Sequence, residues 1–172
     1  MQRVSADTLA AVRRYGAADM RPTLLFHGET LAPDVFEQRW QRSAGALAAA
    51  GIGDGDVVAL LMRNSPEALE LMIAVRHLGA QWCPINWHSK EAEVQYILGN
   101  SGAKLLVADA ALLAALPALD TQGVPVRTIR GTQPGVPAWE ALRDAAEPMP
   151  EPAAAPRGAM FYTSGTTGRP KG

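Results

Sequence analysis

Segments with the apolar spacing of helices alternate along this chain with short apolar runs that are typical of buried strands. Helical patterns are expected at residues 5–18, 33–50, 66–79, 90–98, 110–116 and 139–146. Strand patterns are expected at residues 57–62, 81–85, 104–108, 124–129 and 158–163, after a hairpin at 24–31 that turns at Gly28. Because helices that connect strands in this order place them side by side and parallel, the sequence predicts an α/β fold with mostly parallel strands.

Local end signals support several of these helices. Ser65 can accept a hydrogen bond from the first turn, Pro66 suits the first helical position, and Glu67 places a carboxylate near the positive end. Pro33 suits the same position of an earlier helix, which Gly51 can close. The patterns therefore predict helix starts at Pro33 and Pro66.

The composition is that of an ordinary soluble domain or of part of a larger one. The 172 residues carry a formal net charge of −1, which gives no basis for binding nucleic acid or an acidic membrane. No apolar stretch reaches membrane-spanning length and no signal core is present, so a cytoplasmic location is expected. The single cysteine, Cys83, excludes an intrachain disulfide and lies in a strand pattern, where a core thiol is expected.

The last eleven residues combine groups that suit a polyphosphate ligand. They are Tyr162-Thr163-Ser164-Gly165-Thr166-Thr167-Gly168-Arg169-Pro170-Lys171-Gly172. The serine and threonine hydroxyls can donate hydrogen bonds, and the glycines let backbone N–H groups approach a ligand closely. The lysine adds a mobile cation.

The spacing in this segment excludes better-known loops. A Walker A loop needs Gly-Lys-Ser/Thr, whereas Gly168 is followed by Arg169. A nucleophile elbow needs G-x-S-x-G, whereas Tyr162 stands two residues before Ser164, and no dinucleotide fingerprint is present. A flexible Gly/Thr linker is the plainer alternative, but it does not account for the whole string.

Composition also divides the chain into three expected parts. Residues 1–146 are interpreted as a partial N-terminal α/β subdomain, and residues 158–172 as a strand with the phosphate-binding loop. Residues 147–157 hold four prolines and no periodic pattern, so an extended and exposed connector is expected between them.

The segment 162–172 closely resembles the phosphate-loop signature of the adenylate-forming superfamily. This superfamily comprises AMP-forming acyl- and aryl-CoA synthetases, luciferases and the adenylation domains of peptide synthetases. Residues 51–61, 64–67, 75–86 and 101–107 resemble its upstream segments in the same order, so the resemblance covers residues 22–172. Asn86 after Pro84-Ile85, and the Thr166-Thr167 pair, resemble acyl-CoA synthetases more than amino-acid-activating domains.

The resemblance implies a ligase that uses ATP, Mg²⁺ and CoA. A carboxylic acid, fatty or aryl, would be activated as an acyl-adenylate and transferred to the CoA thiol. The implied phosphate-binding residues are Thr163, Ser164, Gly165, Thr166, Thr167, Gly168 and Lys171. The Thr163 hydroxyl is also a candidate ligand for Mg²⁺, and a homodimer is a candidate assembly.

The resemblance further implies that the chain is an N-terminal fragment, inactive alone. The family's acid pocket, adenine site and catalytic lysine follow this loop, so no complete catalytic set is expected here. Alternatives are an adenylating enzyme with another acceptor, as in peptide synthetases, and a non-catalytic nucleotide-binding or assembly module.

Other histidine, arginine, tryptophan and aspartate residues are interpreted as structural and not as parts of a binding site. His88 is expected in a solvent-facing loop, and His27 and His77 lack metal-ligand spacing. Arg39 and Arg42 are expected on a solvated helix face. The tryptophans and the turn aspartates are expected to serve packing and turn formation; they are Trp40, Trp82, Trp139, Asp54 and Asp56.

Overall fold

Four parallel strands form the central sheet in the part of the chain that the structure describes, residues 23–164 and 170–171. In this computed structural model the strands are β3 Val57–Leu61, β4 Gln81–Pro84, β5 Leu105–Asp109 and β6 Val126–Ile129. Their order is β4-β3-β5-β6, so β3 pairs with β4 on one side and with β5 on the other. The predicted α/β fold with parallel strands is confirmed.

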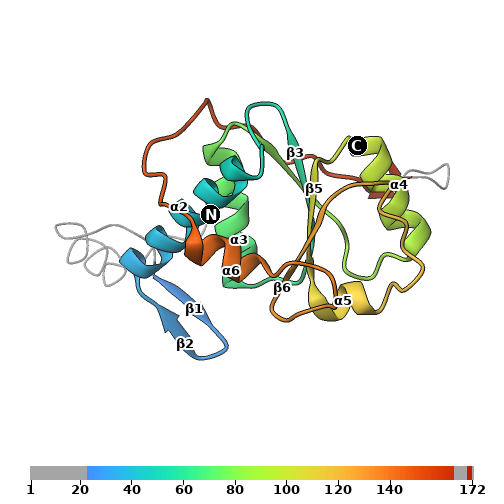
Figure 1. The fold of residues 1–172 in the computed structure, drawn as a ribbon, viewed down its shortest axis with the longest axis horizontal. Coiled ribbons are helices and arrows are strands. Elements are labelled where there is room, and N and C mark those ends of the chain that lie inside the picture. The colour runs from blue at the N-terminus through green and yellow to red at the C-terminus, as the bar shows by residue number, and fades with distance from the viewer. Residues whose placement is uncertain (1–22, 165–169, 172) are drawn as a thin grey trace, which may run out of the picture. The chain divides into compact units, whose positions relative to one another are not determined.

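Helices precede, connect and follow these strands, and they cover both faces of the sheet (Figure 1). They are α2 Pro33–Ala49, α3 Pro66–His77, α4 Glu91–Ser101, α5 Ala110–Ala114 and α6 Trp139–Ala145. The helices predicted over this part are confirmed, with ends displaced by less than one turn. The helix predicted at residues 5–18 lies outside the described residues. Within the described residues, no helix has the length and apolar character needed to cross a bilayer.

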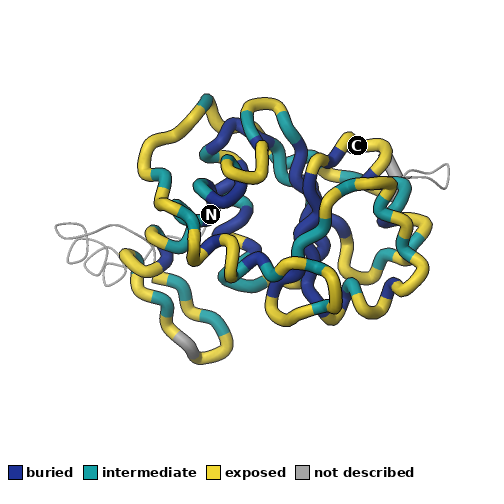
Figure 2. The backbone as a smooth tube through the Cα atoms, viewed as in Figure 1, coloured by how far each residue is buried: buried dark blue, intermediate teal, exposed yellow. Residues whose placement is uncertain are grey.

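Two apolar clusters, one on each face of the sheet, make up the core. Successive side chains of a strand point to opposite faces. On β3, Val58 and Leu60 therefore pack with α2, α3 and α6, whereas Val57, Ala59 and Leu61 pack with α4 and α5. Every residue of β3 and β5 is buried, as Figure 2 shows for the centre of the fold. Because both faces of the sheet are covered, every position of a central strand such as β3 or β5 can be apolar, which explains the continuous apolar runs in the sequence.

The described residues fall into two compact units that divide between Phe36 and Glu37. In the first unit, β1 Leu24–Phe26 and β2 Glu29–Leu31 pair antiparallel. Their turn residues, His27 and Gly28, have φ values of 49° and 83°, the sign that a two-residue hairpin turn requires. The predicted hairpin is confirmed. The sheet, helices α3 to α6 and the part of α2 from Glu37 onward belong to the second unit.

A buried charge cluster joins three helices of the second unit. Glu70 on α3 is 1% exposed, and its carboxylate lies 2.7 Å from Arg39 Nε of α2 and 3.2 Å from Arg143 Nη1 of α6. Burial raises the pKa of Glu70 to about 7, against the opposing effect of both guanidinium groups. The prediction that Arg39 lies on a solvated face was wrong, because its side chain is only 25% exposed and pairs with the buried Glu70 of α3.

Arg42 also departs from its predicted place on a solvated face. Its Nη1 donates to the carbonyl oxygens of Asp144 at 3.0 Å and Ala146 at 2.8 Å, both at the end of α6. Carbonyl groups at a helix end lack intrahelical partners, so an arginine from another helix can satisfy them. Arg42 therefore attaches the end of α6 to α2.

Candidate phosphate-binding site

The predicted phosphate loop begins and ends in a small hairpin. β7 Thr163–Ser164 pairs antiparallel with β8 Pro170–Lys171, and Thr163 lies opposite Lys171. The backbone thus brings together two candidate residues that are eight positions apart in sequence. Four further candidates, Gly165, Thr166, Thr167 and Gly168, lie outside the described residues.

The strand predicted at 158–163 was wrong in extent, because only Thr163 and Ser164 are in β conformation at this point. Upstream, Met160 N donates to Trp82 O of β4 at 3.0 Å. A parallel ladder would next require an N–H from residue 84, and Pro84 has none. The segment before β7 therefore runs beside β4 without forming a regular fifth strand of the sheet.

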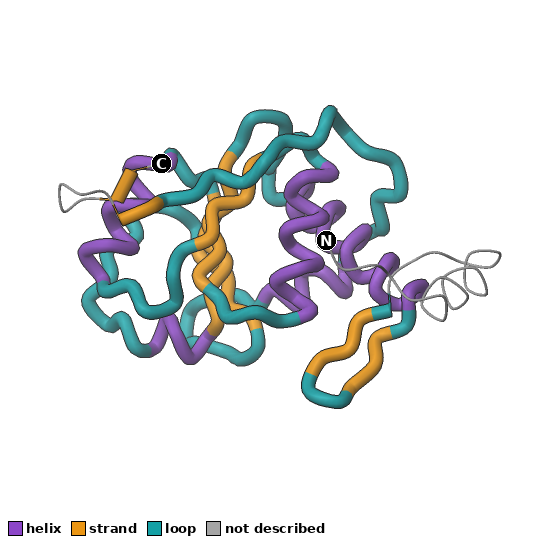
Figure 3. The backbone as a smooth tube through the Cα atoms, turned by 180° about the vertical axis from the view of Figure 1, so that it is seen from behind, coloured by secondary structure: helices purple, strands orange, loops and turns teal. Residues whose placement is uncertain are grey.

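Residues 147–162, here called the strap, lead from α6 to the hairpin as one long irregular segment (Figure 3). The strap is mostly exposed, as predicted for its proline-rich portion, but it is anchored along its length. Met149 N donates to Gln41 O and Ala153 N donates to His77 O, each at 3.0 Å. The strap is therefore attached in turn to α2, to α3 and, through Met160, to β4.

Two glycines allow the strap to approach these helices closely. A Cβ at Gly45 of α2 would overlap the carbonyl oxygen of Glu147. A Cβ at Gly79, which follows α3 with φ +72°, would lie 2.6 Å from Ala154 Cβ and 2.7 Å from Asp54 Oδ1. Both distances are too short for a real Cβ atom, so these positions require glycine while the strap is in place.

An ion pair fixes the later part of the strap to the loop before β3. Arg157 Nε and Nη2 donate to the two carboxylate oxygens of Asp54 at 3.0 and 3.2 Å. The hydrogen bond from Arg157 lowers the pKa of Asp54. In the same turn, Asp56 accepts from Gly53 N at 2.9 Å, which agrees with the predicted role in turn formation.

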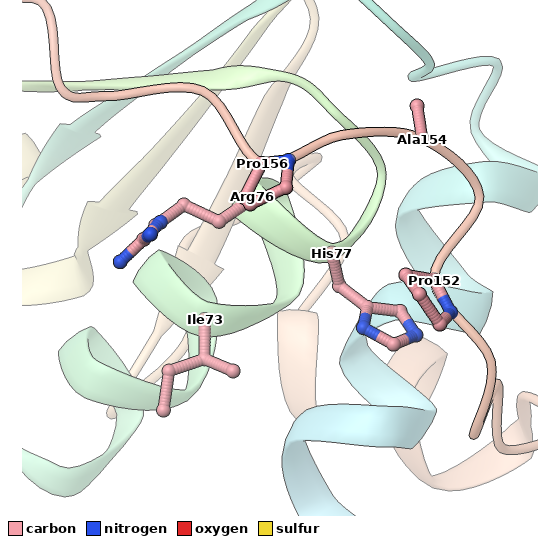
Figure 4. Close-up of a pocket in the computed structure, with 6 residues that line it drawn as sticks. All are labelled: Ile73, Arg76, His77, Pro152, Ala154 and Pro156. Carbon is pink, nitrogen blue, oxygen red and sulfur yellow. The ribbon is translucent and has the colours of Figure 1, made fainter.

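A groove of about 290 Å³ lies along the seam between α3 and the strap (Figure 4). It is lined by Ile73, Arg76, His77, Pro152, Ala154 and Pro156. The His77 ring packs edge-on against Trp40 with centroids 5.0 Å apart, which supports the structural interpretation of both residues. The groove follows the seam, and its lining does not include Thr163, the described candidate whose side chain is placed.

Aromatic contacts mark the junction between strap and hairpin. Phe161 packs edge-on against Trp82 with ring centroids 5.4 Å apart, although Phe161 remains 60% exposed. Tyr162 Oη donates to Asn100 Oδ1 of α4 at 2.6 Å, and its ring lies edge-on to Tyr96. Asn100 was not among the predicted site residues, because its partner is 62 positions away and no local pattern links them.

The residues that lead into the β7–β8 hairpin contact the amino-terminal edge of the sheet, where the parallel strands begin. Trp82 is the second residue of β4, and Asn100 lies in the last turn of α4, just before β5. Ligands of open α/β sheets usually bind at the opposite edge, where parallel strands end. From sheet topology alone, a ligand would be expected at the carboxyl-terminal edge and not at this hairpin.

The carboxyl-terminal edge carries a different group of side chains. The Arg63 guanidinium lies 4.7 Å from the centroid of the Trp87 ring and 4.0 Å from Asp109 Oδ2. His88 packs against Trp87 and is exposed, as predicted for a loop histidine. None of the contacts described for this group reaches Thr163 of the hairpin.

Cys83 and Trp139 occupy the core positions predicted for them. Cys83 is 0% exposed, and burial raises the pKa of its thiol to about 11. Trp139 is 1% exposed within the cluster formed with α2 and α3. Both side chains therefore serve packing in the core.

Comparison with known proteins identifies relatives over nearly the whole chain. The model of the AMP-binding enzyme family matches residues 14–172. The fatty acid–[acyl-carrier-protein] ligase ScoC of Streptomyces coeruleorubidus is 34% identical over 155 residues, which are 88% of this chain and 29% of that protein. The long-chain-fatty-acid–CoA ligase FadD13 of Mycobacterium tuberculosis is 40% identical over 133 residues, 76% of this chain and 26% of that protein.

Solved structures share the fold as well as the sequence. An acyl-CoA synthetase of Brucella canis has a TM-score of 0.76 and 26% identity, over 92% of this chain and 31% of that one. The N-terminal domain of FACL13 from Mycobacterium tuberculosis has a TM-score of 0.69 and 30% identity, over 93% of this chain and 42% of that one. The chain spans between a quarter and a third of the length of the two ligases above. With a family match from residue 14 to residue 172, the chain belongs to the AMP-binding enzyme family.

Proposed function

We propose that this chain is the N-terminal part of an AMP-forming acid–CoA ligase and that it binds the phosphates of ATP. The observation that carries the proposal is the β7–β8 hairpin, where the backbone reverses direction between Ser164 and Pro170. This reversal coincides with the glycine- and threonine-rich part of the segment 162–172. The acid–thiol ligases among the relatives support the same reaction class.

The reaction has two steps, and the hairpin serves the first. A carboxylate oxygen of the acid attacks the α-phosphorus of ATP, the bond to the bridging oxygen breaks, and pyrophosphate leaves. A thiol sulfur then attacks the acyl carbon, and AMP leaves with the electrons of the acyl–oxygen bond. Negative charge grows on the departing pyrophosphate, so donors and a cation held beside it lower the barrier.

The residues of the hairpin have distinct parts in this step. Hydroxyls of Thr163 and Ser164, with backbone N–H groups of the loop, hold the β- and γ-phosphates. Lys171 offsets the charge that develops on pyrophosphate. The pairing of Thr163 with Lys171 supports this assignment, because it places the hydroxyl-bearing strand beside the lysine-bearing one.

Magnesium requires a separate test against the donor set. Mg²⁺ takes oxygen ligands, commonly one or two carboxylates together with substrate phosphates. Among the described residues, no group of three or more His, Cys, Asp or Glu side chains comes together to hold a metal. Thr163 offers one exposed hydroxyl. These residues do not form a metal site by themselves, and we treat Mg²⁺ as the ion that accompanies ATP.

The relatives support a proposal for the acid and for the acceptor. We infer a fatty or aryl acid and a CoA thiol, and the relative that acts on an acyl-carrier protein makes a carrier-bound thiol the second candidate acceptor. ATP and CoA are cytoplasmic metabolites, so the proposed location is the cytoplasm. Sedimentation would test the proposed homodimer.

Lys171→Ala tests the proposed function in the protein that contains this chain with its downstream sequence. A charge-assisted hydrogen bond contributes about 1.5–3 kcal/mol, so single-turnover adenylate formation should slow by about 10- to 100-fold. Binding of the acid should be unchanged. Lys90→Ala is the matched control, because it removes an exposed lysine at the start of α4, outside the hairpin. Adenylation at the wild-type rate in Lys171→Ala would refute the role of the hairpin.

A further inference from the structure

The side chain of Tyr162 attaches the phosphate-binding hairpin to the body of the protein. Tyr162 directly precedes β7, so the position of Tyr162 determines where β7 begins. Its hydroxyl donates to Asn100 Oδ1 at 2.6 Å, and its ring lies at 90° to that of Tyr96 with centroids 6.5 Å apart. Tyr96 and Asn100 are one turn apart on α4, so one face of this helix receives the whole side chain.

Helix α4 is a rigid support for this contact. Its opposite side is buried in the core through Val94, Ile97, Leu98 and Ser101, and it closes at Gly102 in the left-handed conformation. Asn100 is exposed, but its backbone belongs to the last turn of this packed helix. The core therefore holds in place the backbone that carries the Asn100 side chain.

The Tyr162–Asn100 bond lies just beyond the backbone hydrogen bonds that attach the strap to the rest of the protein. The last backbone hydrogen bond between strap and sheet is that of Met160 with Trp82, and Phe161 is largely exposed. The Tyr162 hydroxyl is protonated and able to donate at neutral pH, since burial raises its pKa above the ordinary value of 10. Between Met160 and β7, the Phe161 ring packs against Trp82, and Tyr162 adds a hydrogen bond to α4.

We propose that Asn100 is a positioning residue for adenylation, acting through Tyr162 to set the direction in which β7 leaves the body. Thr163 and Ser164 follow Tyr162 directly, so a rotation at Tyr162 moves both candidate phosphate ligands. The inference rests on the proposed function, since it specifies how the same hairpin is held against ATP.

A positioning role and a purely structural role predict different results. A single hydrogen bond between solvent-accessible side chains contributes little to the stability of the fold. A small displacement of groups around a reacting centre, by contrast, can reduce the rate strongly. Loss of the Asn100–Tyr162 bond should therefore affect use of ATP far more than resistance to unfolding.

The test compares Asn100→Ala, Tyr162→Phe and the double variant in the protein that contains this chain with its downstream sequence. Each single variant should raise KM for ATP by about three- to tenfold in carboxylate-dependent pyrophosphate exchange, with a smaller change in kcat. The double variant should be no worse than either single one, because both remove the same bond. Tyr96→Phe, which removes a hydroxyl one turn away on α4 and keeps the ring, should match the wild type.

Separate outcomes identify which claim fails. If the wild type exchanges pyrophosphate and Asn100→Ala keeps its KM for ATP, the positioning role is refuted while the proposed function stands. Losses that add up in the double variant, or equal losses in Tyr96→Phe, also refute it. A thermal midpoint that falls in proportion to activity would assign the bond to fold stability instead. A wild type without carboxylate-dependent exchange overturns the proposed function and the positioning role together.

Discussion

Replacing Gly45 with alanine should destabilise the protein, although this change inside a helix normally stabilises it. Alanine is favoured over glycine by about 1 kcal/mol in a helix interior. At Gly45 of α2, however, the new Cβ would overlap the carbonyl oxygen of Glu147 and lie 3.3 Å from its carbon. The obstacle is backbone, which cannot rotate away as a side chain can, so the start of the strap has to move.

The cost of that movement follows from the bonds around it. Arg42 Nη1 donates to Asp144 O and Ala146 O, and Met149 N donates to Gln41 O. Weakening two or three such bonds at about 1 kcal/mol each outweighs the helix gain of about 1 kcal/mol. The free energy of unfolding should therefore fall by about 1–2 kcal/mol in Gly45→Ala.

A second helical glycine provides the matched control. A Cβ at Gly99 of α4 would lie 2.5 Å from Gln122 Oε1, which is the end of a flexible side chain and can swing away. Gly99→Ala should keep the helix gain and raise the free energy of unfolding by up to about 1 kcal/mol. Urea denaturation of both variants measures the difference. Equal stabilisation in both would refute the placement of the strap against α2.

Two further predictions concern buried titratable groups. Cys83, with burial raising its pKa to about 11, should react with a thiol reagent at pH 8 only as the protein unfolds, and rapid labelling under native conditions would contradict its place in the core. Burial raises the pKa of Glu70 from 4.5 to about 7 in the folded state, so its protonated form is favoured there despite Arg39 and Arg143. The contribution of this group to stability is then full below pH 4.5 and is lost as the pH rises through 7. Urea midpoints at pH 5 and pH 8 should show the wild type losing stability relative to Glu70→Gln as the pH rises, and a constant difference would contradict this.

Local patterns were sufficient to predict the helices and strands of the described sheet. The continuous apolar runs of β3 and β5 are buried on both faces, and Ser65 caps α3 by accepting from Ala68 N at 3.2 Å. Such features depend on neighbours within a few positions. The sequence pattern could therefore identify them without knowledge of the fold.

Predictions failed where the partner of a residue is distant in sequence. Arg39 was assigned to solvent because nothing near it indicates that Glu70 is buried beside it. The strand at 158–163 was predicted too long, because the pairing depends on Pro84 of another element. The resemblance predicted a phosphate-binding loop at residues 162–172, whereas the strap contacts and the Asn100–Tyr162 bond required the structure.

Carboxylate-dependent exchange between ATP and pyrophosphate tests the central claim most directly. It should be measured on this chain and on the protein extended by its downstream sequence, with acetate, medium- and long-chain fatty acids and benzoates. Exchange is expected in the extended protein, where the acid that supports it identifies the substrate class, and none is expected in the 172-residue chain alone. Absence of exchange in both proteins with every acid would contradict the assignment of the hairpin to acid adenylation.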